Sequence, residues 1–406
     1  MKIKALIFGW EFPPYNVGGL GVACKGLTYA LCGFGVEIIF VLPKKMDVSA
    51  DYMKIVFADA VMMKCTAINS LLLAYDTLNS YEESYRNNPL AAKYGRNLFE
   101  EVDFYGQKAY HIIKREKFDI IHAHDWLTIP AALLAKKMTA KPLVLHIHAT
   151  EFDRSGDNGA NPDVYEIEKR GMDAADVIIA VSNFTKNKII KYYGIDPAKI
   201  RVVHNAAEDV SQSLGDTSIL EDVYRLKAIG KKIVLYLGRI TLHKGPDYFI
   251  RAAKLVLDRD PDVIFIVAGS GDMEHKIIEL AAELGISGNM IFTGFLREEK
   301  LVKVYRAADL YVMPSVSEPF GITALEAMNY NTPVLVSRQS GVSEVITHAL
   351  KVDFWDIQEM ANKMLAVLEH RALAETLKEN GWHDLEKISW KNSAQAVVNI
   401  YKELIK

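Results

Sequence analysis

The sequence predicts an α/β protein made of two doubly wound halves. Short apolar runs such as Lys4–Gly9 alternate with segments of helical character, which is typical of parallel sheets whose strands are joined by helices. The alternation stops in a polar stretch at residues 206–231 and restarts at Ile233–Leu237. Because 406 residues are enough for two domains, we expect one over residues 1–206 and another over 207–389, with the polar stretch as the hinge.

The individual elements follow from apolar runs, turn residues and helical spacing. Residues 46–115 are less regular and indicate an excursion from the alternation, with a helix at its end. The expected strands are Lys4–Gly9, Val36–Leu42, Phe118–His124, Pro142–His146, Val177–Val181, Ile200–Val203, Ile233–Leu237, Val263–Val267, Met290–Phe292, Ala308–Met313 and Pro333–Ser337. The expected helices include Val22–Leu31, Leu98–Lys114, Phe184–Tyr193, Pro246–Asp258, Ile322–Tyr330 and Trp390–Lys406.

Composition and charge argue against several classes of protein. Half of the residues are hydrophobic and 24% are charged, as in an ordinary globular domain, and a net charge of −3 offers no basic surface for nucleic acid. Three cysteines without C-x-x-C spacing indicate neither a disulfide framework nor a zinc site. No run approaches the roughly 18 apolar residues that span a bilayer, and the apolar N-terminus is too short for a signal peptide. We expect a cytoplasmic protein without a transmembrane segment.

The stretch Ser317–Glu326 reads Ser-Glu-Pro-Phe-Gly-Ile-Thr-Ala-Leu-Glu and carries the strongest chemical signal. It follows the apolar run Ala308–Met313, and Pro319 and Gly321 predict a tight turn before the next helix. Unpaired N–H groups at a helix start suit phosphate, because they and the positive end of the helix dipole both face the anion. This stretch therefore predicts a phosphate site beside a turn.

Three polar side chains of this stretch extend the phosphate site. Glu318 lies in the turn, and Thr323 and Glu326 lie in the first turns of the helix. Carboxylates suit sugar hydroxyls, since each accepts two or more charge-assisted hydrogen bonds. One segment could thus hold both ends of a sugar nucleotide. The alternative is structural, because Thr323-x-x-Glu326 also fits a capping box that only satisfies backbone N–H groups.

Two further loops follow predicted strands. Arg239 and Lys244 lie five residues apart after Ile233–Leu237, where two cations could stabilise a diphosphate leaving group; the alternative is a solvated surface pair. Near the N-terminus, Gly18-Gly19-Leu20-Gly21 lies between a strand and a helix, and glycine lets the backbone approach an anion. This second loop could equally be a packing turn, and it does not match the dinucleotide fingerprint.

Two H-x-H pairs, His122/His124 and His146/His148, lie at the ends of neighbouring predicted strands, with Asp125 following the first pair. Alternate strand residues share a face, so each pair could ligate a metal ion, and a metal-dependent hydrolase is the corresponding alternative. The later strands offer no further obvious ligands. We therefore favour histidines at the sheet edge or in the core and expect no metal site.

Together these motifs resemble the retaining glycosyltransferases of the GT-B fold, family 4 (glycosyltransferase group 1). The most specific element is E-x7-E, from Glu318 to Glu326, supported by R-x4-K from Arg239 to Lys244. Gly18–Gly21 and His122–Trp126 resemble the glycogen and starch synthases of the group. The resemblance implies two Rossmann-like domains facing a central cleft. The first would bind the acceptor and the second the nucleotide-sugar donor, with the final helix at 390–406 crossing back to the first.

The resemblance also implies roles for individual residues. Arg239 and Lys244 would bind the donor diphosphate, Glu326 the ribose hydroxyls, and Asp125 would lie on the acceptor and sugar side. The implied catalytic residues are His148, Arg239, Lys244 and Glu318. The implied donor-binding residues are Gly18, Gly19, Asn205, Gly294, Phe295, Phe320, Gly321, Thr323 and Glu326.

The function implied is transfer of a hexose from a nucleoside diphosphate sugar to an acceptor hydroxyl. Glucose is the leading candidate for the hexose, and a growing α-glucan is the leading candidate for the acceptor. No cofactor or essential metal is expected. The alternatives are a transferase that makes a glycolipid, a cell-surface glycan or a small glycoside such as sucrose, and a nucleotide-sugar binding protein without turnover. Asn16 stands where starch-type synthases carry a lysine, so the donor base stays open. The expected partners are the donor and a carbohydrate or lipid acceptor, with peripheral membrane contact allowed and the oligomeric state open.

Overall fold

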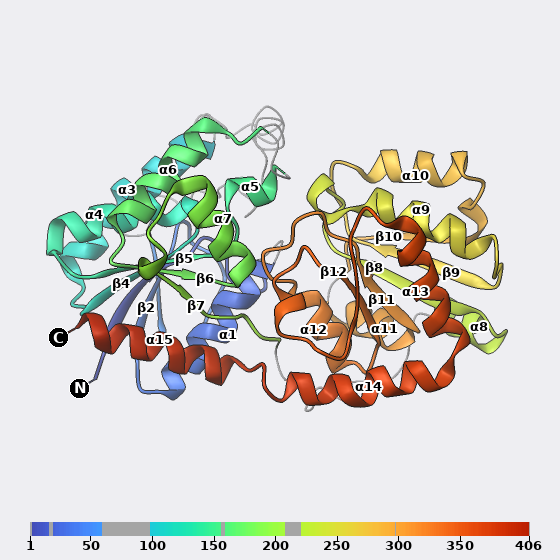
Figure 1. Ribbon diagram of the computed structural model, residues 1–406. Coiled ribbons are helices and arrows are strands. Elements are labelled where there is room, and N and C mark those ends of the chain that lie inside the picture. Colours follow the sequence, from blue (N-terminus) through green and yellow to red (C-terminus); the bar gives the residue numbers. More distant parts are fainter. Residues whose placement is uncertain are drawn as a thin grey trace. The chain divides into compact units, whose positions relative to one another are not determined.

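The computed structural model describes residues 2–15, 19–58, 98–155, 159–207, 221–296 and 298–405 (Figure 1). The chain divides into two compact units. The first comprises Met1–Glu151, Gly159–Asn205 and Trp390–Lys406, and the second comprises Phe152–Asn158 and Ala206–Ser389. The C-terminal segment therefore belongs to the same unit as the N-terminus.

The first unit is built on a seven-stranded parallel sheet in the order β3-β2-β1-β4-β5-β6-β7. The strand order reverses at β1, which pairs in parallel with β2 on one side and with β4 on the other. The strands are β1 (Lys4–Phe8), β2 (Glu37–Leu42), β3 (Lys54–Phe57), β4 (Ile120–His124), β5 (Leu143–Ile147), β6 (Val177–Ala180) and β7 (Ile200–Val202).

Helices pack on both faces of this sheet (Figure 1). The helices α3, α4 and α6 contact one another over one face, and α1 packs against α15 on the other. Their bounds, with α5 and two 3-10 turns, are α1 (Gly19–Gly33), α3 (Leu98–Arg115), η3 (Trp126–Thr128), α4 (Ile129–Thr139), α5 (Glu151–Arg154), α6 (Pro162–Ala174), α7 (Asn183–Tyr193), η4 (Pro197–Lys199) and α15 (Trp390–Leu404).

Local sequence explains where these helices begin and end. Asn161 caps α6 by accepting hydrogen bonds from two backbone N–H groups of its first turn, and Ser182 caps α7 by accepting one from Thr185 N–H. Gly194 ends α7 at φ 63°, a conformation that glycine adopts without strain. Gly26 lets α15 come close, because a Cβ there would lie 2.3 Å from the Trp390 ring.

The second unit is built on a six-stranded parallel sheet in the order β10-β9-β8-β11-β12-β13, with its reversal between β8 and β11. The central strand β9 reads VIFIVA and is buried throughout, as expected for a strand covered on both faces. The strands are β8 (Lys232–Leu237), β9 (Val263–Ala268), β10 (Met290–Gly294), β11 (Leu310–Met313), β12 (Val334–Ser337) and β13 (Leu350–Val352).

Helices also cover both faces of this second sheet. The helices α9, α10 and α13 pack along one face, and α8, α11 and α12 lie along the other (Figure 1). The bounds are α8 (Glu221–Ala228), η5 (Leu242–Lys244), α9 (Pro246–Leu257), α10 (Glu274–Glu283), η6 (Ser287–Asn289), α11 (Glu298–Ala307), α12 (Ile322–Asn329), η7 (Val342–Glu344), α13 (Ile357–Glu369) and α14 (Arg371–Leu385). The predicted fold class, two parallel α/β sheets flanked by helices, is therefore confirmed.

The structure corrects four details of the sequence reading. β3 lies inside the supposedly irregular stretch 46–115, and α8 lies inside the polar stretch expected to be the irregular hinge. β13 was not predicted, because a three-residue strand gives almost no periodic signal. Gly19–Gly21 form the first turn of α1 and not a loop. No helix in the described ranges is both long and apolar enough to cross a membrane.

Candidate functional site

In the second unit, the loops after neighbouring strands meet at the carboxyl edge of the sheet. Gly245, which starts α9 at φ 63°, lies against the loop after β11, and a Cβ there would be 2.2 Å from the carbonyl oxygen of Pro314. Gly269, after β9, has φ 139° and lies so close to Gly238 that a Cβ would be 1.9 Å from its carbonyl oxygen. Only glycine permits both approaches, and the first brings two loops together at the strand-order reversal between β8 and β11, where open α/β sheets bind ligands.

The predicted cation Lys244 and the predicted carboxylate Glu318 meet at this edge. Lys244 Nζ donates to Glu318 Oε2 at 2.5 Å, and Ser315 Oγ approaches the same oxygen at 3.3 Å. Glu318 is also held by its backbone, since its N–H donates to Gln339 and its carbonyl accepts from Gly341. The carboxylate is largely buried, and the Lys244 ammonium balances its charge.

The other predicted cation, Arg239, leaves β8 on the same edge. Its Nη2 lies 3.2 Å from Nε2 of the buried His243. Its backbone carbonyl accepts from the hydroxyl of Tyr236 at 2.9 Å. The sequence therefore placed both cations on the correct loop and missed the histidine between them.

The helix α12 begins at this edge, and its start is defined by Gly321. This glycine has φ 108° and caps the helix without a side-chain hydrogen bond. The preceding Phe320 is buried, and its carbonyl accepts from Val342 N–H at 2.6 Å. The start of α12 thus has the geometry expected of an anion site, with Gly321 conformationally suited to the turn.

The alternative reading of Thr323 and Glu326 as a capping box is wrong. Thr323 Oγ1 takes a hydrogen bond from the hydroxyl of Tyr311 at 2.8 Å, and Glu326 Oε2 takes one from the hydroxyl of Tyr305 at 2.8 Å. Tyr305 also reaches the Thr323 carbonyl at 3.2 Å. Two tyrosines from α11 and β11 therefore hold the two side chains that the sequence assigned to the nucleotide.

Both tyrosines remain protonated donors. Burial raises the pKa of Tyr305 well above its usual value, and the nearby Glu326 carboxylate raises it further. Burial likewise raises the pKa of Tyr311. The rings pack edge to face, with centroids 6.1 Å apart. Sequence reasoning could not find this pair, because their partners lie 12 to 21 residues away along the chain.

The remaining donor-side predictions are spread over both units. Gly294 ends β10 at φ 66°, and Phe295 follows it with about half of its surface exposed. In the first unit Asn205 is buried and follows β7. Gly19 starts α1, and Gly18 lies outside the described residues.

A carboxylate that the sequence analysis missed engages the start of α1. Glu11 is buried in the turn after β1, and its Oε1 accepts from Gly21 N–H at 2.7 Å. This places a negative charge at the positive end of the helix, which stabilises it. The Pro-Pro turn that holds Glu11 was visible in the sequence, but its partner was not.

Asp125 ties the ends of β4 and β5 together. Its backbone has φ 59° and ψ 175°, a conformation that is strained for any residue except glycine. Its Oδ1 accepts from the N–H groups of His148 at 2.6 Å and Ala149 at 3.3 Å. The predicted acceptor-side residue therefore also fixes the loop that carries the predicted catalytic His148.

The four histidines of the H-x-H pairs form two layers in the core of the first unit. In one layer His122 Nε2 lies 3.3 Å from His146 Nδ1, and in the other His124 Nδ1 lies 2.9 Å from His148 Nε2. The ring centroids of these pairs are 5.4 Å and 5.1 Å apart. The layers lie over one another with centroid separations of 4.4–4.6 Å.

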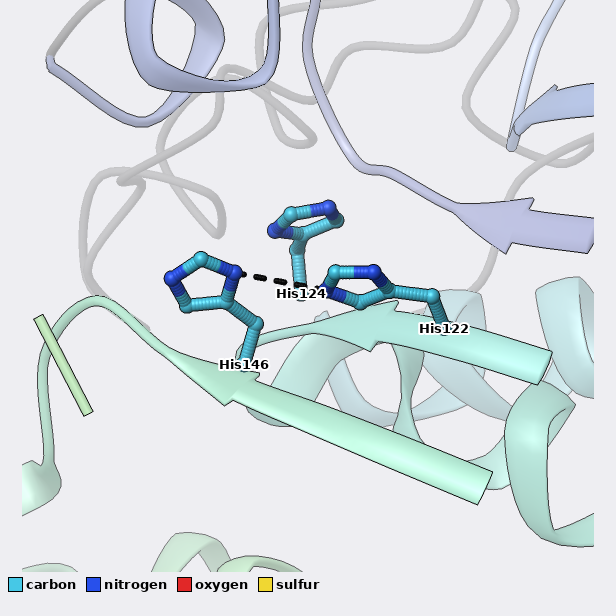
Figure 2. A group of neighbouring side chains, drawn as sticks. All are labelled: His122, His124 and His146. Carbon is cyan, nitrogen blue, oxygen red and sulfur yellow. Dashed lines mark hydrogen bonds between the residues drawn. The ribbon is translucent and has the colours of Figure 1, made fainter. Parts of the chain in front are cut away.

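This geometry bears on the metal alternative. Ligand nitrogens of His122, His124 and His146 lie within 4.8 Å of one another. However, the His122 and His146 nitrogens point at each other, and His124 lies to one side of the line that joins them (Figure 2). His122 Nδ1 is also engaged by the Tyr401 hydroxyl of α15 at 2.5 Å. Hydrogen bonds thus occupy both nitrogens of His122, whereas His124 Nε2 and His146 Nε2 are buried without a hydrogen-bond partner among the described residues.

The histidines are buried as neutral rings. Burial lowers the pKa of His122 and of His148 to about 3, with a further contribution from the His148 ring in the case of His122. Burial, followed by the neighbouring imidazoles, also holds the pKa values of His124 and His146 well below the usual value. His148 is therefore available as a neutral hydrogen-bonding group and not as a cation.

Comparison with known proteins identifies the class to which this site belongs. The family model for Glycosyltransferase Family 4 matches residues 17–209, and the model for Glycosyl transferases group 1 matches residues 224–384. An uncharacterised glycosyltransferase of Methanocaldococcus jannaschii is 30% identical over 98% of both chains. The chain belongs to the group 1 glycosyltransferases of family 4, as its motifs predicted.

Other relatives have more specific names. The D-inositol 3-phosphate glycosyltransferase of Mycolicibacterium smegmatis is 31% identical over 70% of this chain and 67% of that protein. Among solved structures, sucrose-phosphate synthase from Thermosynechococcus elongatus has a TM-score of 0.76 at 19% identity, covering 99% of both chains. The Anabaena protein HepE in complex with UDP-glucose has a TM-score of 0.68 at 18% identity, covering 99% of this chain and 100% of that one. These structures confirm the GT-B fold.

The neutral histidines make the stability of the first unit depend on pH. Each ring with a folded pKa below the unfolded value of about 6.5 takes up a proton on unfolding at lower pH. The free energy of unfolding should therefore fall as pH drops from 6.5 towards 3, by up to about 1.4 kcal/mol per pH unit for each ring. Urea unfolding at several pH values, with hydrogen exchange of β4 and β5, measures this slope. His146→Asn should reduce it, whereas the exposed His275→Asn should not; equal slopes in all three proteins would contradict the prediction.

Removing the Tyr305 hydroxyl tests whether it holds Glu326. Tyr305→Phe should raise the KM for the nucleotide-sugar donor by about 2- to 13-fold, because one hydrogen bond of about 0.5–1.5 kcal/mol is lost. The kcat should change little, since Glu326 is assigned to the nucleotide and not to the reacting carbon. Tyr110→Phe, on the surface of α3, is the control. An unchanged KM for the Tyr305 variant would show that Glu326 does not need the hydrogen bond from the Tyr305 hydroxyl.

Proposed function

We propose that the protein is a retaining glycosyltransferase that moves a hexose from a nucleoside diphosphate sugar to an acceptor hydroxyl. Glucose is the leading candidate for this hexose. The observation that carries this proposal is the grouping at one sheet edge of two cations, Arg239 and Lys244, with two carboxylates, Glu318 and Glu326. A nucleotide sugar presents the matching chemistry, namely a diphosphate between two sets of hydroxyls. A binding protein without turnover would not need cations placed to stabilise a leaving group.

In this mechanism the second unit holds the donor. The diphosphate lies at the start of α12, where Thr323 donates its hydroxyl and the free N–H groups face the anion. Arg239 and Lys244 neutralise the charge that builds on the diphosphate as it leaves. Glu326 accepts from the ribose hydroxyls, and Glu318 accepts from the donor sugar. The loop at Gly294 and Phe295 borders the base.

The reaction itself exchanges one bond at the anomeric carbon for another. The bond from this carbon to the diphosphate oxygen breaks, and the acceptor oxygen forms a bond on the same face, so the configuration is retained. The leaving diphosphate takes the proton of the acceptor hydroxyl, which removes the need for a protein base. The residues assigned to this step from the first unit are His148 as a neutral hydrogen-bond donor to the sugar, Asp125 and Asn205 near the sugar or acceptor, and Gly18 and Gly19 over the phosphates.

No metal is required in this proposal, because the positive field comes from Arg239, Lys244 and the start of α12. A metal would serve the same purpose in neutralising the diphosphate. The ion pair with Glu318 fixes the position of Lys244 at this edge of the sheet.

The leading acceptor is a growing α-glucan, on the strength of the synthase-like motifs Gly18–Gly21 and His122–Trp126. A small polyol or sugar phosphate is the second candidate. It is favoured by relatives named for D-inositol 3-phosphate and for sucrose phosphate. UDP-glucose is the first donor to test, because the similar HepE structure contains it.

Release of nucleoside diphosphate from a panel of UDP-, ADP- and GDP-sugars tests the proposal, with and without glycogen, inositol phosphate or fructose phosphate. We expect release from one donor, accelerated by one acceptor, and unchanged by excess EDTA. Acceleration by glycogen would establish a glucan synthase, and acceleration by a sugar phosphate the second candidate. Loss of activity in EDTA would overturn the metal-independent mechanism. No release from any donor, together with no nucleotide binding, would overturn the function.

Two substitutions separate binding from chemistry. Glu326→Ala should raise the donor KM about tenfold or more, because hydrogen bonds to a charged group contribute about 1.5–3 kcal/mol. Arg239→Ala should lower kcat by about 10²- to 10³-fold, since it acts on the charge that develops in the transition state. Steady-state kinetics measures both, with the exposed Glu279→Ala and Arg259→Ala as matched controls. Near-neutral effects in both site variants would refute the site assignment.

A further inference from the structure

His243 lies inside the R-x4-K element, between Arg239 and Lys244, at a position for which the motif specifies no residue. It is only 6% exposed, although it belongs to a short turn at the edge of the sheet. Its ring contacts Arg239 through Nε2 at 3.2 Å and the Thr241 hydroxyl through Nδ1 at 3.2 Å. Both ring nitrogens are therefore engaged within the loop.

The contact with Arg239 fixes the proton on this ring. A guanidinium can only donate, so His243 Nε2 must accept and must carry no proton. The neutral ring then has its proton on Nδ1, which donates to the Thr241 hydroxyl. Thr241 thus selects the tautomer that can hold Arg239.

The backbone of His243 bonds to the loop after β11, on the side of the site that carries Glu318. Its carbonyl oxygen accepts from Val316 N–H at 3.0 Å and from Ser317 N–H at 3.2 Å. These residues lead directly to Glu318, so the loop after β11 is anchored on the loop after β8. One residue therefore bonds to the Arg239 side chain and positions the turn that carries the sugar-side carboxylate.

We propose that His243 is a positioning residue for transfer, which holds the Arg239 guanidinium against the donor diphosphate through its unprotonated Nε2. This inference rests on the proposed function, because it assigns Arg239 to the leaving group. A long arginine side chain has many rotamers, and a fixed acceptor reduces the entropy lost when its guanidinium meets the transition state. The side chain acts on Arg239, whereas the backbone contacts persist in any substitution at this position.

A double-mutant cycle in kcat tests the proposal. His243→Leu should lower kcat by about tenfold or more through the loss of the acceptor for a charged donor, with a smaller change in donor KM. The same substitution in an Arg239→Ala background should have almost no further effect on kcat. His243→Gln, which offers an amide oxygen as acceptor, should recover much of the loss, and Thr241→Val should give a partial loss.

A purely structural role gives a different result. If His243 only supports the fold, its effect on kcat will persist in the Arg239→Ala background, and that additivity would overturn the proposal. Thermal unfolding of each variant identifies a general loss of stability. Failure of the proposed function is distinguishable, since the wild-type protein would then release no nucleoside diphosphate.

A measurement without catalysis tests the same contact. Nitrogen NMR of labelled histidines should find the His243 proton on Nδ1 in the wild-type protein, and Arg239→Ala should shift the ring towards the other tautomer. A wild-type ring with its proton on Nε2 would overturn the proposal whether or not the protein transfers sugar.

Discussion

The contact between the loops after β8 and β11 is the constraint on which the candidate site depends. Parallel strands deliver their carboxyl ends to one edge of the sheet, but the side chains that follow can meet only if the backbones come close. Gly245 against the Pro314 carbonyl provides that approach, and the His243 carbonyl adds two hydrogen bonds across the same gap. The Lys244–Glu318 pair is a consequence of this contact, because each loop contributes one of its partners.

The first unit buries polar side chains near the point where the order of its strands reverses. Asp125 has a strained backbone conformation, and its Oδ1 accepts hydrogen bonds from the N–H groups that follow β5. Hydrogen bonds between neutral rings link the histidines behind it, and Tyr401 from the C-terminal helix bonds to one layer. Within the part of the chain that the structure describes, His124 Nε2 and His146 Nε2 are buried without a hydrogen-bond partner. This rigid network holds His148 at the end of β5, where strand ends and their loops carry functional groups in such folds.

Much of the fold followed from the sequence because buried parallel strands leave continuous apolar runs, as β9 does. β3 and β13 were not predicted, because they are short and only half buried and so lack such a run. Of the candidate site, the positions of Arg239, Lys244 and Glu318 after strands, and of Thr323 and Glu326 at a helix start, were predictable from turn chemistry and motif spacing. Their hydrogen-bond partners were not. Tyr305, Tyr311 and His243 look like ordinary residues of a helix, a strand and a turn, and the pattern Thr-x-x-Glu is the same whether it caps a helix or points away from the cap.

The membership of α15 in the first unit has a consequence for synthesis of the chain. Ala394, Val397 and Tyr401 of this helix are fully buried, and Trp390 packs into the space left by Gly26. The seven parallel strands of the first unit are made early, yet the surface that α15 covers stays exposed until this helix is synthesised. Domains generally fold as units in the order of their synthesis. Here the second unit, whose residues end at Ser389, is complete before the first one. The N-terminal sheet must therefore remain partly uncovered until α15 has been made, and a chain that lacks this helix would keep an apolar face that chaperones recognise.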